Sequence, residues 1–168
     1  MKKKKKEREY WQRRFGNLAA DDMAAYYHHL DLRPFWDLDD EGLAYLLTNV
    51  KGVDMLDLNE TAITNESIKL LTKLEYVKEL RLKECRQLDN GCAESLNKLT
   101  DLEFLHLKST AVTIDGLLQL SDLSKLKELM FSTDDVESIK DKMLQLKALL
   151  PGCEFTVNSK PYYFNEGQ

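Results

Sequence analysis

The chain has 168 residues, 43% of them hydrophobic, which favours one domain with a substantial core. Its formal net charge is −5, and setting aside the five charges of Lys2–Lys6 leaves −10 for the remainder. An acidic body does not suit nucleic-acid binding, which needs Lys and Arg to replace the counterions of phosphate. We therefore expect no nucleic-acid partner, and instead a protein partner with a basic or mixed-charge surface.

Cysteine usage and hydropathy indicate the compartment. The chain has three cysteines, without the paired short-range spacing of small disulfide-rich secreted domains. The residues after Lys2–Lys6 lack the apolar run of a signal peptide, and no segment approaches the ~20 apolar residues that span a bilayer. We expect a soluble intracellular protein, either cytoplasmic or peripheral to a membrane complex.

Residues 1–27 predict a basic tail followed by an amphipathic helix, with Trp11, Phe15 and Leu18 at helical spacing. Because the bare end of a stack of repeats exposes its core, this helix is expected to be an N-terminal cap. An alternative is weak contact with an anionic membrane surface through Lys2–Lys6 together with Trp11 and Phe15. Lys2–Lys6 alone also fit a solvated tail.

Residues 28–158 repeat a pattern in which a short apolar strand is followed by a helix. Leu56, Leu80, Leu105 and Leu129 occupy the same strand position and are 24, 25 and 24 residues apart. A degenerate earlier unit and a final strand extend the pattern to about five repeats, with about six strands and four to five helices. Units of this kind must stack to bury a core, which predicts an α/β solenoid with a parallel concave sheet and convex helices.

The starts of the predicted helices carry cap residues. Asp39, Thr64, Asp89 and Thr113 each stand immediately before a helical pattern. Such side chains accept hydrogen bonds from the free amides of the first turn. Each is therefore expected to be an N-cap.

The repeat pattern resembles the leucine-rich repeat superfamily, specifically its cysteine-containing subtype. Residues 76–105, "YVKELRLKECRQLDNGCAESLNKLTDLEFL", are also similar to the mitochondrial ATP synthase coupling factor B (subunit s) family and the related distal-membrane-arm assembly factors of complex I. This resemblance implies attachment to a respiratory complex or assembly of one. In coupling factor B, the corresponding stretch is associated with a Cys-x-Cys dithiol. This chain has Lys83 in place of the first of these two cysteines and matches the second with Cys85.

Two cysteine positions fit a structural role in the repeat. Cys85 stands where other units have Thr61, Thr110 and Asp134, a slot expected to satisfy backbone groups of the turn after the strand. Cys92 falls in a slot for small residues early in each helix. The other residues in that slot are Gly42, Ser67 and Gly116.

An enzymatic alternative would use Cys85 as a nucleophile with His106 as its base. Neither an orienting carboxylate nor an oxyanion hole is evident for this pair. The sequence also has no phosphate loop, dinucleotide fingerprint or His-Glu-x-x-His motif, and no further Cys or His at metal-ligand spacing. We expect a protein that is not an enzyme and has no metal or cofactor.

Alternation along the strands predicts which side chains face solvent on the concave side. Solenoids use this surface for binding, and exposed apolar groups among charges resemble the anchors of an interface. The predicted protein-binding residues are Met55, Asp57, Arg81, Lys83, Phe104, His106, Lys108 and Met130.

The leading functional hypothesis is a non-catalytic interaction module that binds a protein through this face. One version is an accessory or assembly factor of a respiratory membrane complex, which the family resemblance favours. The other is an immunity or inhibitor protein that neutralises a basic toxin such as a nuclease, which the acidic body favours. Residues 159–168 form a C-terminal tail, in which residues 161–164 either fold back over the last repeat or dock to a partner.

Overall fold

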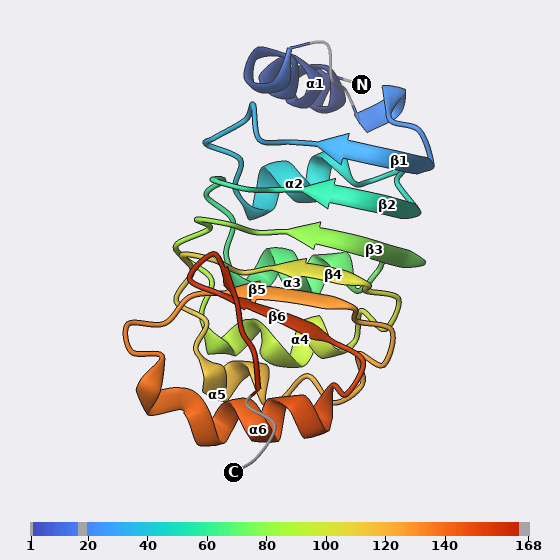
Figure 1. Ribbon diagram of the computed structural model, residues 1–168. Coiled ribbons are helices and arrows are strands. Elements are labelled where there is room, and N and C mark those ends of the chain that lie inside the picture. Colours follow the sequence, from blue (N-terminus) through green and yellow to red (C-terminus); the bar gives the residue numbers. More distant parts are fainter. Residues whose placement is uncertain (1, 17–19, 165–168) are drawn as a thin grey trace.

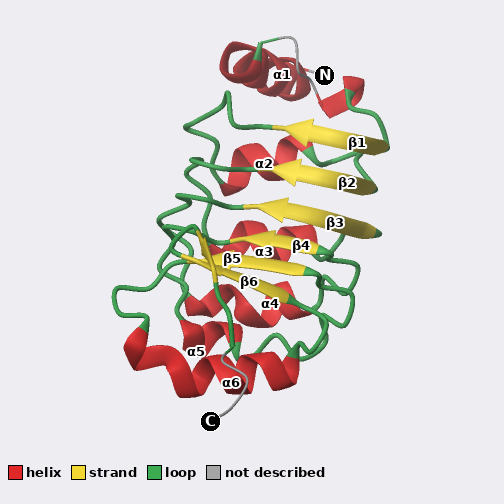
Figure 2. Cartoon of the chain, in the orientation of Figure 1, coloured by secondary structure: helices red, strands yellow, loops and turns green. Residues whose placement is uncertain are grey.

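A computed structural model describes the backbone of residues 2–16 and 20–164; the side chains of residues 2–4 and 21 lie outside this description. The fold is α/β, with one seven-stranded open sheet (Figures 1 and 2). The strands are β1 (Tyr26–Asp31), β2 (Gly52–Asp57), β3 (Tyr76–Arg81), β4 (Phe104–His106), β5 (Glu128–Phe131), β6 (Glu154–Val157) and β7 (Lys160–Pro161). The helices are α1 (Lys2–Phe15), α2 (Asp40–Leu46), α3 (Asn65–Leu71), α4 (Ala93–Asn97), α5 (Ile114–Leu117) and α6 (Lys140–Leu149), with short 3-10 turns η1 (Ala20–Asp22), η2 (Asn90–Cys92) and η3 (Glu137–Ile139).

The strands lie in the sheet in chain order. Strands β1 to β6 pair in parallel, and helices α2 to α6 lie on one side of the sheet (Figure 1). The chain therefore alternates strand and helix, and each strand with its following helix is called here a strand-helix unit. Strand β7, in the segment predicted as a tail, pairs antiparallel to β6 through a two-residue turn. Asn158 and Ser159 in that turn both have positive φ, as a tight two-residue hairpin requires.

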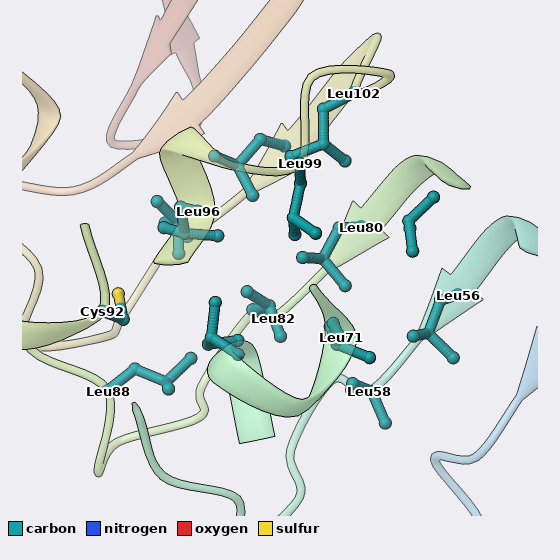
Figure 3. Packing of buried hydrophobic residues seen from close by; sticks show 14 of the residues in the cluster. Leu56, Leu58, Leu71, Leu80, Leu82, Leu88, Cys92, Leu96, Leu99 and Leu102 are labelled. Atoms are coloured by element: carbon teal, nitrogen blue, oxygen red, sulfur yellow. The ribbon is translucent and has the colours of Figure 1, made fainter. Parts of the chain in front are cut away.

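The core lies between the sheet and the helices. Leu56, Leu80, Leu105 and Leu129 align across neighbouring strands, and all four are fully buried. Figure 3 shows Leu80 and Leu82 lying among leucines of the helical segments, including Leu71 and Leu96. Burying a leucine side chain stabilises the fold by about 1.5–3 kcal/mol, so these rows are a principal source of stability.

Three of the four predicted N-caps are confirmed. Asp39 accepts a hydrogen bond from the Gly42 amide, and Thr64 and Asp89 likewise accept amide hydrogen bonds at the starts of α3 and η2. The fourth prediction is wrong, because the Thr113 side chain makes no cap hydrogen bond. Its hydroxyl instead accepts a hydrogen bond from Nδ2 of Asn90 in the preceding unit, at 2.8 Å.

The helix starts are also joined from one unit to the next. Asp40 accepts hydrogen bonds from the backbone and hydroxyl of Thr64, at 2.9 and 2.6 Å. In the next unit, Nδ2 of Asn65 donates a hydrogen bond to the Asp89 carboxylate at 2.6 Å. In the unit after that, Nδ2 of Asn90 donates to the Thr113 hydroxyl at 2.8 Å. This ladder holds adjacent helices in register.

The slot occupied by Cys85 satisfies backbone carbonyls, as predicted. The hydroxyl of Thr61 donates to the Leu58 carbonyl at 2.7 Å, and the hydroxyl of Thr110 donates to the Leu107 carbonyl at 2.8 Å. The Cys85 thiol reaches across to the Leu58 carbonyl of the preceding unit, at 3.0 Å. Cys85 is therefore part of the packed turn between units.

Asp134 does not share this role, which corrects the sequence alignment at the fifth unit. Its side chain is exposed, and the neighbouring Asp135 instead accepts a hydrogen bond from the Glu137 amide at 2.9 Å. The turn from β5 to η3 has fewer residues than the turns after the earlier strands, and Asp135 accepts hydrogen bonds from the amides of Glu137 and Ser138 within it.

The first helix covers one end of the stack (Figure 1). Trp11 stacks on Tyr45 with ring centroids 4.7 Å apart, and Phe15 packs edge-on against Phe35. Trp11 and Phe15 are 4% and 3% exposed. These contacts fit a cap, whereas Leu18, which the sequence places on the same face, lies outside the described residues.

The C-terminal segment folds back on the other end of the stack. The Tyr162 amide donates to the Phe155 carbonyl at 2.8 Å, and Phe164 packs edge-on against the Phe155 ring. Of the two expectations for this segment, folding back is confirmed. Tyr163, between these contacts, is 80% exposed.

Candidate functional site

The side of the sheet opposite the helices, called here the open face, brings together all the predicted protein-binding residues. Strand pairing arranges its side chains in rows that cross the sheet. One row contains His29, Met55, Glu79, Phe104, Glu128 and Glu154, and the next contains Asp31, Asp57, Arg81, His106, Met130 and Thr156. A third set follows the strand ends and includes Arg33, Asn59, Lys83, Lys108, Ser132 and Asn158.

The prediction that these residues are exposed is wrong for Asp57, which is only 3% exposed. Its carboxylate accepts a hydrogen bond from the Asn59 amide at 3.1 Å and lies 3.4 Å from Nε of Arg33. Strand alternation places Asp57 on the open face, but does not reveal that neighbouring side chains cover it. The other seven predicted residues are half-buried.

Arg81 lies at the centre of the open face, where it contacts an aromatic ring. The carbon at the centre of its guanidinium group lies 5.3 Å from the centroid of the Phe104 ring, and Nη2 donates to Glu79 at 3.3 Å. Its Nε is buried and has no hydrogen-bond partner among the described residues. Arg81 is thus positioned by an aromatic surface and keeps an unused donor.

His106 neighbours Arg81 in the strand register and shows the same incomplete pairing. Its Nε2 is buried and has no hydrogen-bond partner within the described part of the chain. Burial lowers the pKa of His106, and the positive charges of Lys83, Arg81 and Lys108 lower it further, against a smaller opposing effect of Asp57. Both effects favour the neutral form of the His106 ring.

The two lysines beside His106 differ in their partners. Lys83 lies 3.2 Å from a carboxylate oxygen of Glu84, and this hydrogen bond raises the pKa of Lys83. Lys108 donates to the Ser159 hydroxyl at 2.6 Å, and among the described residues it has no carboxylate partner. Its positive charge is consequently less compensated than that of Lys83.

The charged side chains of the open face differ from row to row. Three glutamates, Glu79, Glu128 and Glu154, lie in the row that contains Met55. The next row and the strand ends hold four basic side chains, Arg33, Arg81, Lys83 and Lys108, together with the carboxylates of Asp31 and Asp57. Although the body of the protein is acidic, the surroundings of His106 are positively charged.

Two features beyond these predicted residues were not found in the sequence. A hollow of about 730 Å³ lies between the turns after β4 and β5, and it is lined partly by Thr110, Thr113, Ser132 and Thr133. Trp36 is 75% exposed beside the turns after the first strands. The periodicity of the sequence identifies neither the hollow nor the exposure of Trp36.

The cysteines do not have the environment of catalytic thiols. Cys85 is fully buried, and burial raises its pKa, although hydrogen bonds from Thr61 and nearby backbone amides oppose that rise. Burial also raises the pKa of Cys92 and of Cys153 to about 12. An activated nucleophile requires the opposite shift, since the thiolate is the reactive form. Within residues 2–16 and 20–164, no group of three or more His, Cys, Asp or Glu side chains is arranged to hold a metal.

The N-terminal helix bears on the membrane alternative. Trp11 and Phe15 pack against the body of the protein, so a membrane contact through them requires α1 to leave its packed position. The side chains of Lys2–Lys4 lie outside the described residues, and those of Lys5 and Lys6 are exposed. None of the described helices is both long and apolar enough to cross a bilayer.

Comparison with known proteins adds no family assignment. No model of a known protein family matches the chain, and a search of curated proteins also finds no match.

Proposed function

We propose that this chain is a non-catalytic interaction module of the leucine-rich repeat type, which binds a protein partner through the open face of its sheet. The observation that carries the proposal is the cluster of half-buried Phe104, Arg81 and His106 at the centre of that face. Aromatic and arginine side chains in partly desolvated positions are the residues that most often dominate protein interfaces.

The repeat assignment rests on two observations. The strand leucines recur at 24 or 25 residues, and the parallel strands lie side by side in chain order. Stacked strand-helix units of this length are typical of leucine-rich repeats, whose sheet surface is the usual binding surface.

As a concrete role, we propose an accessory or assembly factor of a membrane complex, as the resemblance of residues 76–105 suggests. The protein would then work in the cytoplasm or at the periphery of that complex. The positive charge around His106, at the centre of the open face, does not favour the immunity-protein alternative. Arg81, Lys83 and Lys108 would repel the basic active site of a nuclease if this face covered it.

A pull-down with the full chain tests the proposal. Arg81→Glu and Phe104→Ala should each abolish capture of the partner from cells that naturally make the protein. Lys73→Glu and Leu144→Ala are matched controls, because both residues are exposed and lie away from the open face. If all four variants capture the same proteins as the wild type, the open face is not the binding surface.

A further inference from the structure

The side chains between β3 and β4 define a site with its own chemistry, called here the β3–β4 cluster: Arg81, Phe104, His106 and Lys108. We infer that this cluster receives a carboxylate side chain from an acidic, partly apolar segment of the protein partner. The inference rests on the proposed function and adds the chemistry of the partner.

The charges on the open face are unevenly compensated. Arg33 has carboxylates of Asp31 and Asp57 at 2.6 and 3.4 Å. Arg81, in contrast, has one carboxylate contact, to Glu79 at 3.3 Å, and Lys108 contacts only the hydroxyl of Ser159 among the described residues. The unbalanced positive charge is therefore concentrated at the β3–β4 cluster.

The cluster also contains polar atoms whose hydrogen-bonding capacity is unused. Nε of Arg81 and Nε2 of His106 are both buried without a partner among the described residues, and the two residues pair across β3 and β4. Buried polar atoms without partners are unfavourable, so a ligand toward which these two side chains turn on binding gains affinity from the hydrogen bonds that form. A carboxylate has two oxygens, which match the parallel donors of a guanidinium group.

Partial burial strengthens such a contact. The Arg81 side chain is 35% exposed, and Phe104 covers one face of its guanidinium group. An ion pair formed in this position is screened less by water than one formed by a fully exposed lysine. The aromatic ring also limits the orientations of the guanidinium group, which lowers the entropy lost on binding.

The surroundings of the cluster specify the rest of the ligand. Met130 pairs with His106 across β4 and β5, and the Phe104 ring centroid lies 5.3 Å from the central carbon of the Arg81 guanidinium group. Both side chains are half-buried and offer contact to an apolar residue next to the carboxylate. Glu79 and Glu128 line the same face, so a ligand with negative charge along its whole length, such as a phosphate backbone, fits less well than a segment that mixes acidic and apolar residues.

An NMR titration of the full chain tests the inference with two blocked peptides, Ac-EELFEE-NH2 and its charge-reversed counterpart Ac-KKLFKK-NH2. The acidic peptide should shift the resonances of β3 and β4 and raise the pKa of the His106 ring, because a nearby negative charge favours its protonated form. Lys108→Glu should weaken binding by about tenfold or more, because it places like charges together. Lys73→Glu, an equal change of charge away from this face, should weaken it by less than about twofold.

Several outcomes would overturn the inference: no binding of the acidic peptide at millimolar concentration, equal binding of the basic peptide, or shifts that map outside the β3–β4 cluster. Tighter binding of single-stranded oligothymidylate would assign the cluster to phosphate instead of a protein carboxylate. If Arg81→Glu fails to fold, Lys108→Glu still tests the site, because the Lys108 side chain makes a single hydrogen bond among the described residues, to Ser159. If the pull-down depends on Phe104 but the acidic peptide does not bind, only the inference fails, and the proposed function stands.

Discussion

Asp40, at the start of α2, connects two strand-helix units through a single carboxylate. It accepts hydrogen bonds from the amides of Thr64 and Ser67, at 2.9 and 3.1 Å, and from both hydroxyls. Burial alone would raise its pKa, but the hydrogen bonds from Ser67 and Thr64 outweigh burial and lower the pKa below its ordinary value of 3.8. The ionised form of Asp40 therefore stabilises the folded state.

Replacing Asp40 tests the ladder at the helix starts. Asp40→Ala should lower the free energy of unfolding by about 1–3 kcal/mol, since it leaves buried donors without an acceptor. Asp40→Asn should lower the free energy of unfolding by less. Asn65 and Asn90 occupy the equivalent position in the next units and make hydrogen bonds between units there. Urea unfolding measures the free energy of unfolding of both variants. Glu41 is an exposed neighbour of Asp40, so the control Glu41→Ala should change this free energy little.

The Asp40 carboxylate should also make the stability of the folded protein depend on pH. Because the folded-state pKa is lowered, the stabilisation is fully present above pH 3.8 and is lost as the pH falls through the folded-state pKa. The difference in unfolding free energy between wild type and Asp40→Asn should therefore shrink in acid. A difference that stays constant from neutral pH to strong acid would contradict this account of Asp40.

Cys92 should make the protein less stable as the pH rises into the alkaline range. Its pKa rises from an ordinary value of 9.0 to about 12 on folding, because burial disfavours the thiolate. Above about pH 9 the unfolded chain releases this proton before the folded chain does, so stability falls as the pH rises. The wild type should lose stability in this range more steeply than Cys92→Ala, as measured by urea unfolding. Equal slopes would show that Cys92 does not retain its proton on folding.

Single residues were predictable from the sequence where the repeat defines a slot. The positions of Cys85 and Cys92 predicted their packing, because Thr and Gly or Ser fill the same slots in other units. The Asp40 ladder was not predicted, because its hydrogen bonds cross between units at polar positions without an apolar period. The burial of Asp57 depends on the side chains around it, which strand alternation does not specify.

At the scale of elements, Gly116 shows why the 3-10 turn η2 and helix α5 approach closely. A Cβ atom at Gly116 would lie 2.3 Å from Oδ1 of Asn90, whose side chain is held by hydrogen bonds to Thr113. Gly116→Ala should therefore destabilise the protein by about 1–3 kcal/mol in urea unfolding. Gly152→Ala is the matched control, because a Cβ there meets no atom within 4 Å.

The dependence on Asn90 sharpens this test. In an Asn90→Ala background the obstructing side chain is gone, so the added cost of Gly116→Ala should be smaller than in the wild type. A double-mutant cycle measures this difference directly. Additive effects of the two substitutions would show that the clash with Asn90 is not the cause.

The terminal helix α1 also makes an element-scale prediction. Phe15→Ala should reduce the free energy of unfolding by about 3–5 kcal/mol, because a buried aromatic side chain is removed. Tyr10→Ala, at a position that is 51% exposed on the same helix, should have a much smaller effect. Similar costs for the two substitutions in urea unfolding would contradict the packing of α1 on the stack.

The alternation of strand and helix was predictable because apolar residues recur at strand and helix spacing in every unit. The sheet was predicted to have about six strands, and six parallel strands are present. Strand β7 was not predicted, because two residues carry too little pattern and its antiparallel pairing depends on the positive φ values of Asn158 and Ser159.

At the scale of the whole molecule, the sheet has one face packed on helices and one face free of them (Figure 1). The sequence predicted which residues share the open face, because strand register and alternation determine that directly. It predicted a partner with a basic or mixed-charge surface from the acidic body as a whole. The structure shows a different local charge, because Arg81, Lys83 and Lys108 gather around His106 on that face.

Site-specific photo-crosslinking most directly tests whether the open face binds a protein. A photoreactive phenylalanine would replace Phe104 in the full chain, and the matched probe would replace Leu144, which is 59% exposed on α6. Both proteins would be irradiated in cells that naturally make the chain. We predict that the probe at position 104 crosslinks one discrete partner. The probe at position 144 should not crosslink that partner. The same partner crosslinked equally from both positions, or only from position 144, would contradict the account.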